Sequence, residues 1–236
     1  MGLIDYAITF AMVIAVMIGY YHGFIRTAFN IAAVFVCMLI AWIFYDNLSS
    51  NILAINNLVE NISYYSESRD MLNSIPLAYT DVNTLTPDSM AVILSTVNLP
   101  HPLENLLSQN IENLAFATGG YTTIDQYLTM TIVHMSIGIL SYLLIFFGSR
   151  LILAFFINLL DYTIKLPLLR HFDSLAGGAM GFISGILVLF IIFSIAPVIL
   201  AFLPFEDLRL MVEESQLGLF FYQGNFIIDS IKGSVG

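Results

Sequence analysis

The chain has 236 residues, of which 58% are hydrophobic and only 10% are charged. Soluble domains carry about a quarter charged residues, so most of this surface cannot face water, and the abundance of apolar and aromatic residues excludes a disordered chain. Seven Lys and Arg residues against 17 Asp and Glu residues give a formal net charge of -10. That charge would repel nucleic-acid phosphates, so nucleic acid is not an expected partner.

Four apolar runs are long enough to cross a bilayer, which needs about 20 mostly apolar helical residues. They cover about 3–21, 27–45, 130–160 and 175–203. We therefore expect an all-α, polytopic integral membrane protein with four transmembrane helices. The last two runs exceed the bilayer thickness, and Pro197 predicts a kink near the outer end of the fourth.

The connecting segments suggest four parts of the chain. Residues 1–45 form a first transmembrane hairpin, since the link between its helices is only a few residues long. Residues 130–203 form a second hairpin, with a basic loop near 161–174. Between them, the segment 46–129 carries nine carboxylates against a single basic residue, Arg69. The tail, 204–236, alternates apolar and polar residues.

Short amphipathic helices are expected in both the acidic segment and the tail. In the acidic segment, apolar residues recur at helical spacing, interrupted by Pro100 and Pro102. These are Ile93, Val97, Leu103, Leu106, Leu107, Ile111 and Leu114. The pattern predicts two short helices there and one or two more in the tail.

The placement of basic residues predicts the orientation of the helices. Arg26, Arg150, Lys165 and Arg170 lie near the two short loops, and basic residues resist translocation. Both termini and the segment 46–129 should therefore lie outside the cytoplasm. The start of the chain lacks the basic region of a signal peptide, so the first apolar run is expected to remain as an anchor.

Three glycines at four-residue intervals open the fourth membrane helix: Gly177, Gly181 and Gly185. Such spacing makes a groove in which a second helix approaches closely. The partner is either the first or second helix of the same chain, or the same face of another copy. Asp173 and Ser174, just before the glycines, are predicted to cap the start of this helix.

Ionisable residues are costly in lipid, so three of them are candidate polar intramembrane residues: Asp5, His134 and Arg150. Asp5 and His134 enter from the same side and either pair or lie hydrated in the headgroup region. Arg150 either snorkels to the inner headgroups or binds a buried partner such as Asp161, or a substrate anion.

Catalytic templates are missing from the sequence. There is no phosphate-binding loop, no HExxH and no GxSxG motif. The four histidines are scattered, and the single cysteine, Cys37, lies in an apolar run where a packed or lipid-facing thiol is expected. We therefore expect no catalytic residue, no metal site and no cofactor, and the chain is not expected to be an enzyme.

Several motifs together resemble the colicin V production protein family, CvpA. They are Ile4-Asp5 at the start, the turn with Gly19, His22, Gly23 and Arg26, the Asp173-x-x-x-Gly177-x-x-x-Gly181 element, and Ser215-x-Leu217 in the tail. The turn is expected in the cytoplasm. His22 stands where the family usually has arginine, and the segment 46–129 is longer than in compact members.

The resemblance implies a bacterial cytoplasmic-membrane protein linked to the production or export of a peptide toxin and to envelope function. One hypothesis is a non-enzymatic scaffold or accessory component. Its partners would be membrane lipid and either a second copy or another membrane or envelope protein. The other hypothesis is a small channel or transporter subunit for an ion or solute, with Asp5, His134 and Arg150 along a polar route.

Overall fold

The computed structural model describes residues 2–65, 79–96, 99, 102–160, 170–202, 210–212 and 214–231. In these ranges the regular structure is helical, with one isolated antiparallel bridge between Asp81 and Thr123. By length and composition, four helical stretches could cross a membrane: Leu3–His22, Phe24–Leu53, Ile124–Phe155 and Asp173–Phe202. The prediction of an all-α, multi-pass membrane protein is confirmed.

The chain divides into two compact units. The first contains Met1–Tyr45, Ser141–Phe193 and Leu210–Gly224, and the second contains Asp46–Leu140, Ser194–Arg209 and Asn225–Gly236. Each unit therefore combines segments that are far apart in the sequence.

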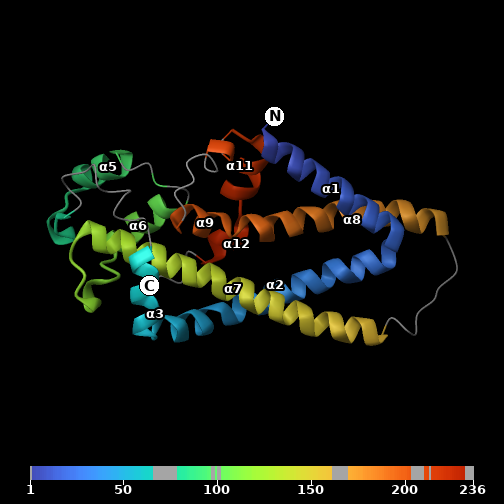
Figure 1. Cartoon of the computed structure of the whole chain (residues 1–236), viewed down its shortest axis with the longest axis horizontal. Coiled ribbons are helices and arrows are strands. Elements are labelled where there is room, and N and C mark those ends of the chain that lie inside the picture. The colour runs from blue at the N-terminus through green and yellow to red at the C-terminus, as the bar shows by residue number, and fades with distance from the viewer. Residues whose placement is uncertain are drawn as a thin grey trace. The chain divides into compact units, whose positions relative to one another are not determined.

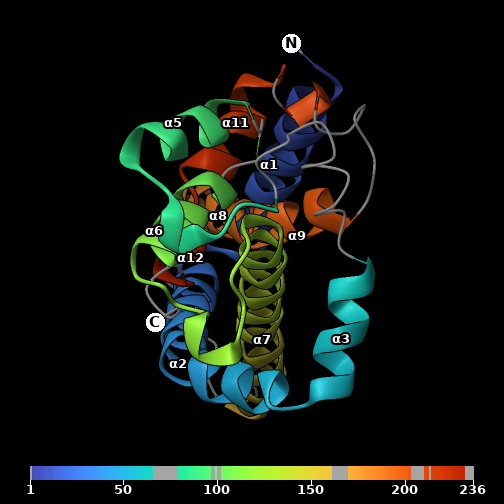
Figure 2. The same cartoon turned by 90° about the vertical axis from the view of Figure 1, so that its left-hand side faces the viewer.

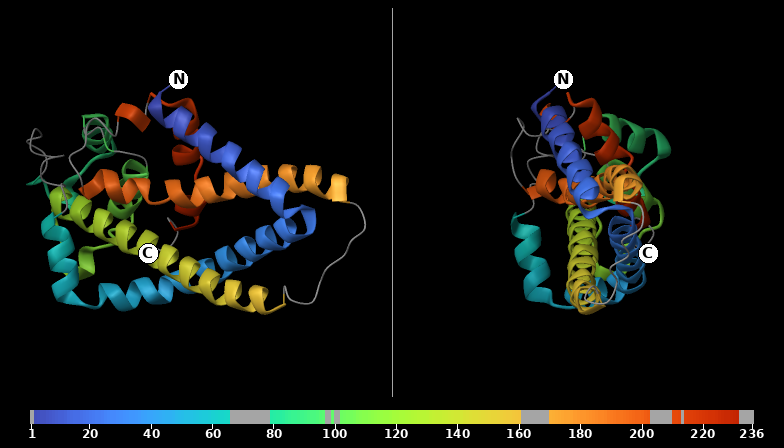
Figure 3. Two further views of the ribbon diagram at one scale, coloured as in Figure 1. Left: turned by 45° about the vertical axis from the view of Figure 1, so that its right-hand side comes forward. Right: turned by 90° about the vertical axis from the view of Figure 1, so that its right-hand side faces the viewer.

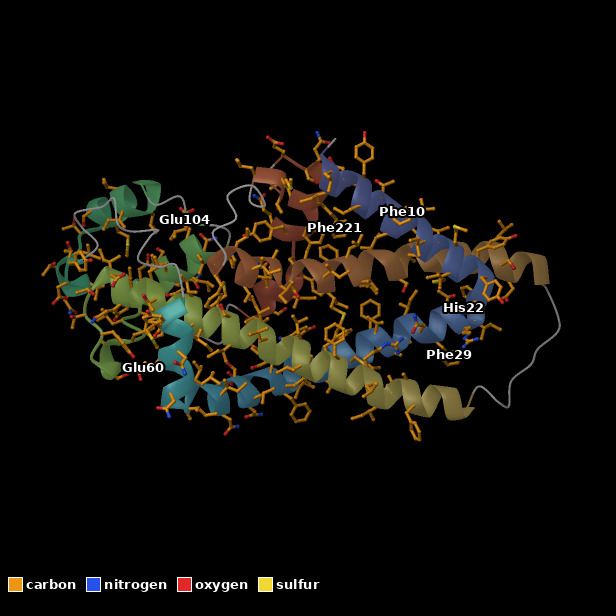
Figure 4. The ribbon with its side chains drawn as sticks, in the orientation of Figure 1. Phe10, His22, Phe29, Glu60, Glu104 and Phe221 are labelled. Atoms are coloured by element: carbon orange, nitrogen blue, oxygen red, sulfur yellow. The ribbon has the colours of Figure 1, made fainter. Side chains whose placement is uncertain are left out.

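The first unit is built around the crossing of two membrane helices. These are α1 (Leu3–His22) and α8 (Arg170–Phe193), and the short tail helix α11 (Gln216–Gln223) packs on both (Figure 1). Ile8, Leu189 and Phe221 form their shared buried cluster, and Figure 4 shows Phe221 on α11. The tail helix is thus part of the core of this unit.

Gly23 separates α1 from α2 (Phe24–Leu53), and at φ 80° it adopts a left-handed conformation that favours glycine. The chain reverses there as predicted, but the two helices diverge from the turn (Figure 3). Helix α1 packs on α8, whereas α2 contacts α7 (Ile124–Leu160), where the rings of Tyr45 and Tyr142 lie 6.3 Å apart. The two helices of the predicted hairpin therefore pack on other helices rather than on each other.

Short helices dominate the second unit (Figure 2). They are α3 (Asn56–Tyr65), η2 (Val82–Thr84), α5 (Pro87–Thr96), α6 (Leu103–Glu112), η3 (Ala117–Gly119), α9 (Ala196–Phe202) and α12 (Phe226–Ile231). Helices α5 and α6 confirm the two predicted in the acidic segment, and α11 and α12 confirm those predicted in the tail. Val97, Pro100, Asp161 and Lys165, which also entered the predictions, lie outside the described residues.

The fourth membrane stretch is interrupted where a kink was expected. Helix α8 ends at Phe193, and α9 begins at Ala196. Pro197 explains this break, because its ring would collide with the carbonyl of Phe193 four residues earlier in a continuous helix. In the first turn of α9 its missing N–H has no cost.

Candidate functional site

The three glycines of α8 lie against α1 in the first unit. Gly177 and Gly181 face Gly19, and all three are buried. A methyl group added to Gly19 would lie 2.6 Å from the Cα of Gly181, and one added to Gly181 would lie 3.0 Å from the Cα of Gly19. Two backbones are in contact here, so any side chain larger than hydrogen forces the helices apart.

The contact continues one turn further along α8. A methyl group on Gly185 would meet the Cβ of Ala15 and the Sδ of Met12, each at 2.9 Å. The whole glycine face of α8 is therefore occupied by α1 of the same chain. Of the two partners considered for this face, the structure shows the intramolecular one.

The turn between α1 and α2 is bonded to the start of α8. The Phe24 N–H donates to Oδ1 of Asp173 at 2.9 Å, and a methyl group on Gly23 would lie 3.0 Å from the Asp173 carboxyl carbon. Asp173 therefore caps α2. The prediction that it caps its own helix was wrong, because α8 already begins at Arg170 and Asp173 lies inside the first turn.

Asp5 lies in the first turn of α1 and is only 3% exposed. Its Oδ1 accepts hydrogen bonds from the Ser215 hydroxyl at 2.6 Å and from the Leu217 N–H at 3.1 Å, while Oδ2 accepts one from the Gly2 N–H at 2.8 Å. The prediction that Asp5 is hydrated was wrong, because its carboxylate is buried and accepts its hydrogen bonds within the first unit. Three donors satisfy the carboxylate inside the protein instead.

Ser215 has a second role at the same place. It is the N-cap of α11, and its Oγ accepts a hydrogen bond from the Gly218 N–H at 2.8 Å. One hydroxyl thus caps α11 and donates to Asp5. Hydrogen bonds to a charged group contribute about 1.5–3 kcal/mol each, so this junction strongly favours the docked position of the tail helix.

Arg150 on α7 is half-buried, and its guanidinium donates to the side-chain oxygen of Asn30 on α2. The expected partner, Asp161, lies outside the described residues. Asn30 was not singled out from the sequence, although an amide in an apolar run is itself a polar intramembrane group. The bond joins two membrane-spanning helices of the first unit.

His134 belongs to a different environment in the second unit. Its half-buried ring lies 5.0 Å from that of Phe116, which also contacts Tyr127 at 5.4 Å. On the same helix, Thr131 accepts a hydrogen bond from the buried Asn110 side chain at 2.9 Å. Aromatic packing and a buried polar pair thus hold α6 and the chain after it against α7.

The turn motif also contains two basic residues. His22 is the last residue of α1 and is exposed (Figure 4). Its ring lies 5.7 Å from that of Tyr21. Arg26, in the first turn of α2, is also exposed. The two glycines of this motif, Gly19 and Gly23, contact α8.

Comparison with known proteins identifies a family match. The family model described as colicin V production protein matches residues 93–223, which is more than half of the chain. The chain belongs to this family. No curated protein and no solved structure matches it.

The sequence motifs that resemble the colicin V production family lie close together along α1. At one end, Asp5 bonds with the Ser215-x-Leu217 element, and at the other, Gly19 and Gly23 contact the element from Asp173 to Gly181. The family match begins at residue 93, so it contains α8 and α11 but not α1. Helix α1 nevertheless contacts both α8 and the tail motif. These contacts join the matched and unmatched parts of the chain in the first unit.

Proposed function

We propose that the chain is a non-enzymatic scaffold or accessory component in the production or export of a colicin V-type peptide toxin, with a wider role in the envelope. The observation that carries this proposal is the family match over residues 93–223. The family description refers to toxin production, and the membrane helices give a place where an accessory component would act.

The contacts of the polar residues favour a structural role over a channel. Asp5 bonds with the tail, Asp173 with the turn before α2, and Arg150 with Asn30. Each bond joins two helices of the first unit, whereas residues that line a polar route would direct their charges toward water or a solute. These side chains are engaged in holding the unit together.

The partner of an accessory component would bind elsewhere than the glycine face, because α1 already covers it. We expect either a second copy of this chain or another membrane or envelope protein. Exposed apolar side chains along the helices would contact lipid or that partner, and examples are Phe29, Leu144 and Leu151. The label in Figure 4 places Phe29 on α2.

The proposed location is the cytoplasmic membrane of a bacterium, with both termini and the segment 46–129 outside. Tyr79 and Tyr21 are matched probes, because their side chains are 74% and 87% exposed. In a Cys37→Ala background, a membrane-impermeant maleimide should label Tyr79→Cys in intact cells and Tyr21→Cys only after lysis. The reverse pattern would contradict the proposed orientation.

The role in toxin production is tested in a strain that makes a colicin V-type peptide and lacks this gene. Wild-type protein and Gly148→Leu should restore toxin in the medium, because a side chain at Gly148 has open space around it. Gly19→Leu should not restore it, because a side chain at Gly19 has no space between α1 and α8. Toxin release that is the same with and without the gene would contradict the role.

A second measurement separates the accessory role from the channel. Purified protein in liposomes should give the same ion flux as empty liposomes. A flux above that background that disappears in Arg150→Gln would favour the channel and count against the accessory role.

A further inference from the structure

A groove of about 540 Å³ lies in the second unit, outside the four membrane-spanning stretches. Residues from η2, α5, α6 and the chain beside them line it. They are Val82, Asn83, Leu85, Thr86, Met90, Leu94, Ser108, Ile111, Glu112 and Leu114. A hollow of this size accommodates several side chains of a binding partner.

The groove presents apolar surface that the fold does not fully cover. Leu85, Met90 and Leu94 are only partly buried. Leu114 is 42% exposed and has a φ of 49°, a backbone conformation that is unfavourable for leucine. Partly exposed apolar side chains gathered in one hollow are typical of a binding surface.

The groove is lined by one charged residue, Glu112, and the segment of the chain that forms it is acidic. Residues 79–129 include five carboxylates, at Asp81, Asp88, Glu104, Glu112 and Asp125, and no lysine or arginine. Glu112 itself lines the groove, and its Oε1 accepts a hydrogen bond from the Ser108 hydroxyl at 3.2 Å. A carboxylate in an acidic segment attracts cationic groups and repels anionic ones.

We propose that this groove binds a cationic amphipathic peptide segment of a partner protein. Apolar side chains of the peptide would enter between α5 and α6, and a lysine or arginine beside them would reach Glu112. Recognition of an amphipathic helix by an apolar groove follows this scheme, in which apolar anchors supply affinity and charges select the partner. Such binding is independent of whether the protein serves toxin production.

The test uses the whole chain in nanodiscs of phosphatidylcholine, a zwitterionic lipid with no net charge. The probe is a fluorescein-labelled amphipathic peptide of leucine and lysine, about 14 residues or four helical turns long. Fluorescence anisotropy measures its binding, and empty nanodiscs give the background to subtract. A peptide with glutamate in place of lysine should not bind above that background.

Two matched pairs of variants locate the binding site. Glu112→Gln should weaken binding about twofold to fivefold, the range for one exposed ion pair, while Glu104→Gln on the same helix should have no effect, because Glu104 does not line the groove. Leu94→Arg should weaken binding at least about tenfold through lost apolar contact and added charge. Val92→Arg, at a 54% exposed position of α5 outside the groove, should not.

Three results would overturn the proposal. They are binding no stronger than to empty nanodiscs, equal weakening by the two glutamate variants, and unchanged binding in a folded Leu94→Arg protein. Circular dichroism reports whether that variant keeps its helices. If it does not fold, the glutamate pair alone decides, because both substitutions are at exposed positions.

Discussion

Replacing Gly19 with alanine is expected to destabilise the first unit, because the new methyl group has no space between α1 and α8. It would lie 2.6 Å from the Cα of Gly181, which is 0.8 Å short of the 3.4 Å at which ordinary contact begins. Its nearest neighbours are backbone atoms, which cannot rotate aside as a side chain would. The two helices must therefore separate, and the packing on both sides of the contact is lost.

The size of the effect follows from comparison with Gly178→Ala. Both substitutions gain the same helix propensity, about 1 kcal/mol, but a methyl group on Gly178 would lie at an ordinary 3.7 Å from the Val16 Cγ1. Overpacking costs about 1–3 kcal/mol, so Gly19→Ala should be less stable than Gly178→Ala by that amount. For a chain of this size the difference corresponds to a melting temperature roughly 2–12 °C lower.

The chain contains its own probe for this measurement. Cys37 is the only cysteine and is fully buried, so a fluorogenic maleimide should react with it only when the first unit unfolds. The two variants are heated in detergent with the dye, and the midpoints of the fluorescence rise are compared. Equal midpoints, or a higher one for Gly19→Ala, would refute the close backbone contact.

The same thiol assay tests three other contacts. Asp5→Ala and Ser215→Ala should each destabilise the first unit. Their double-mutant cycle should give a coupling energy of about 1–3 kcal/mol. Additive effects would contradict the Asp5–Ser215 hydrogen bond. Asp173→Ala should cost about 0.5–2 kcal/mol through loss of the α2 cap, and an unchanged midpoint would count against that cap. Asn30→Leu should lower the stability of the first unit by about 1 kcal/mol, because Arg150 loses its hydrogen bond. Adding Arg150→Leu to the same chain should restore much of that stability. Absence of this rescue would argue against the Arg150–Asn30 pairing.

The four membrane helices could be predicted because hydropathy is a property of contiguous residues. Their ends were less accurate, since polar residues do not stop a helix whose backbone bonds remain satisfied. Helix α2 continues eight residues past Tyr45 to Leu53. There, Ser50 and Asn51 donate side-chain hydrogen bonds to carbonyls four residues earlier on the same helix.

The partners of the site residues could not be predicted from spacing alone. The glycine spacing indicated a close helix contact, but Gly19 was assigned only to the turn motif because no local pattern relates it to Gly181. The Asp5–Ser215 bond spans 210 residues, and Asp173 caps a helix that begins 149 residues earlier. Such contacts depend on how the helices cross, which periodicity does not encode.

The account depends on α1 being joined to the tail helix, and a disulfide tests this most directly. A Cβ on Gly2 would lie 3.9 Å from the Cβ of Ser215, which is within the range of natural disulfides. In a Cys37→Ala background, Gly2→Cys with Ser215→Cys should crosslink under mild oxidation in membranes, whereas Gly2→Cys with the 59% exposed Phe220→Cys should crosslink much more slowly. Absence of the first crosslink, or equal rates for both pairs, would contradict the docking of the tail on α1.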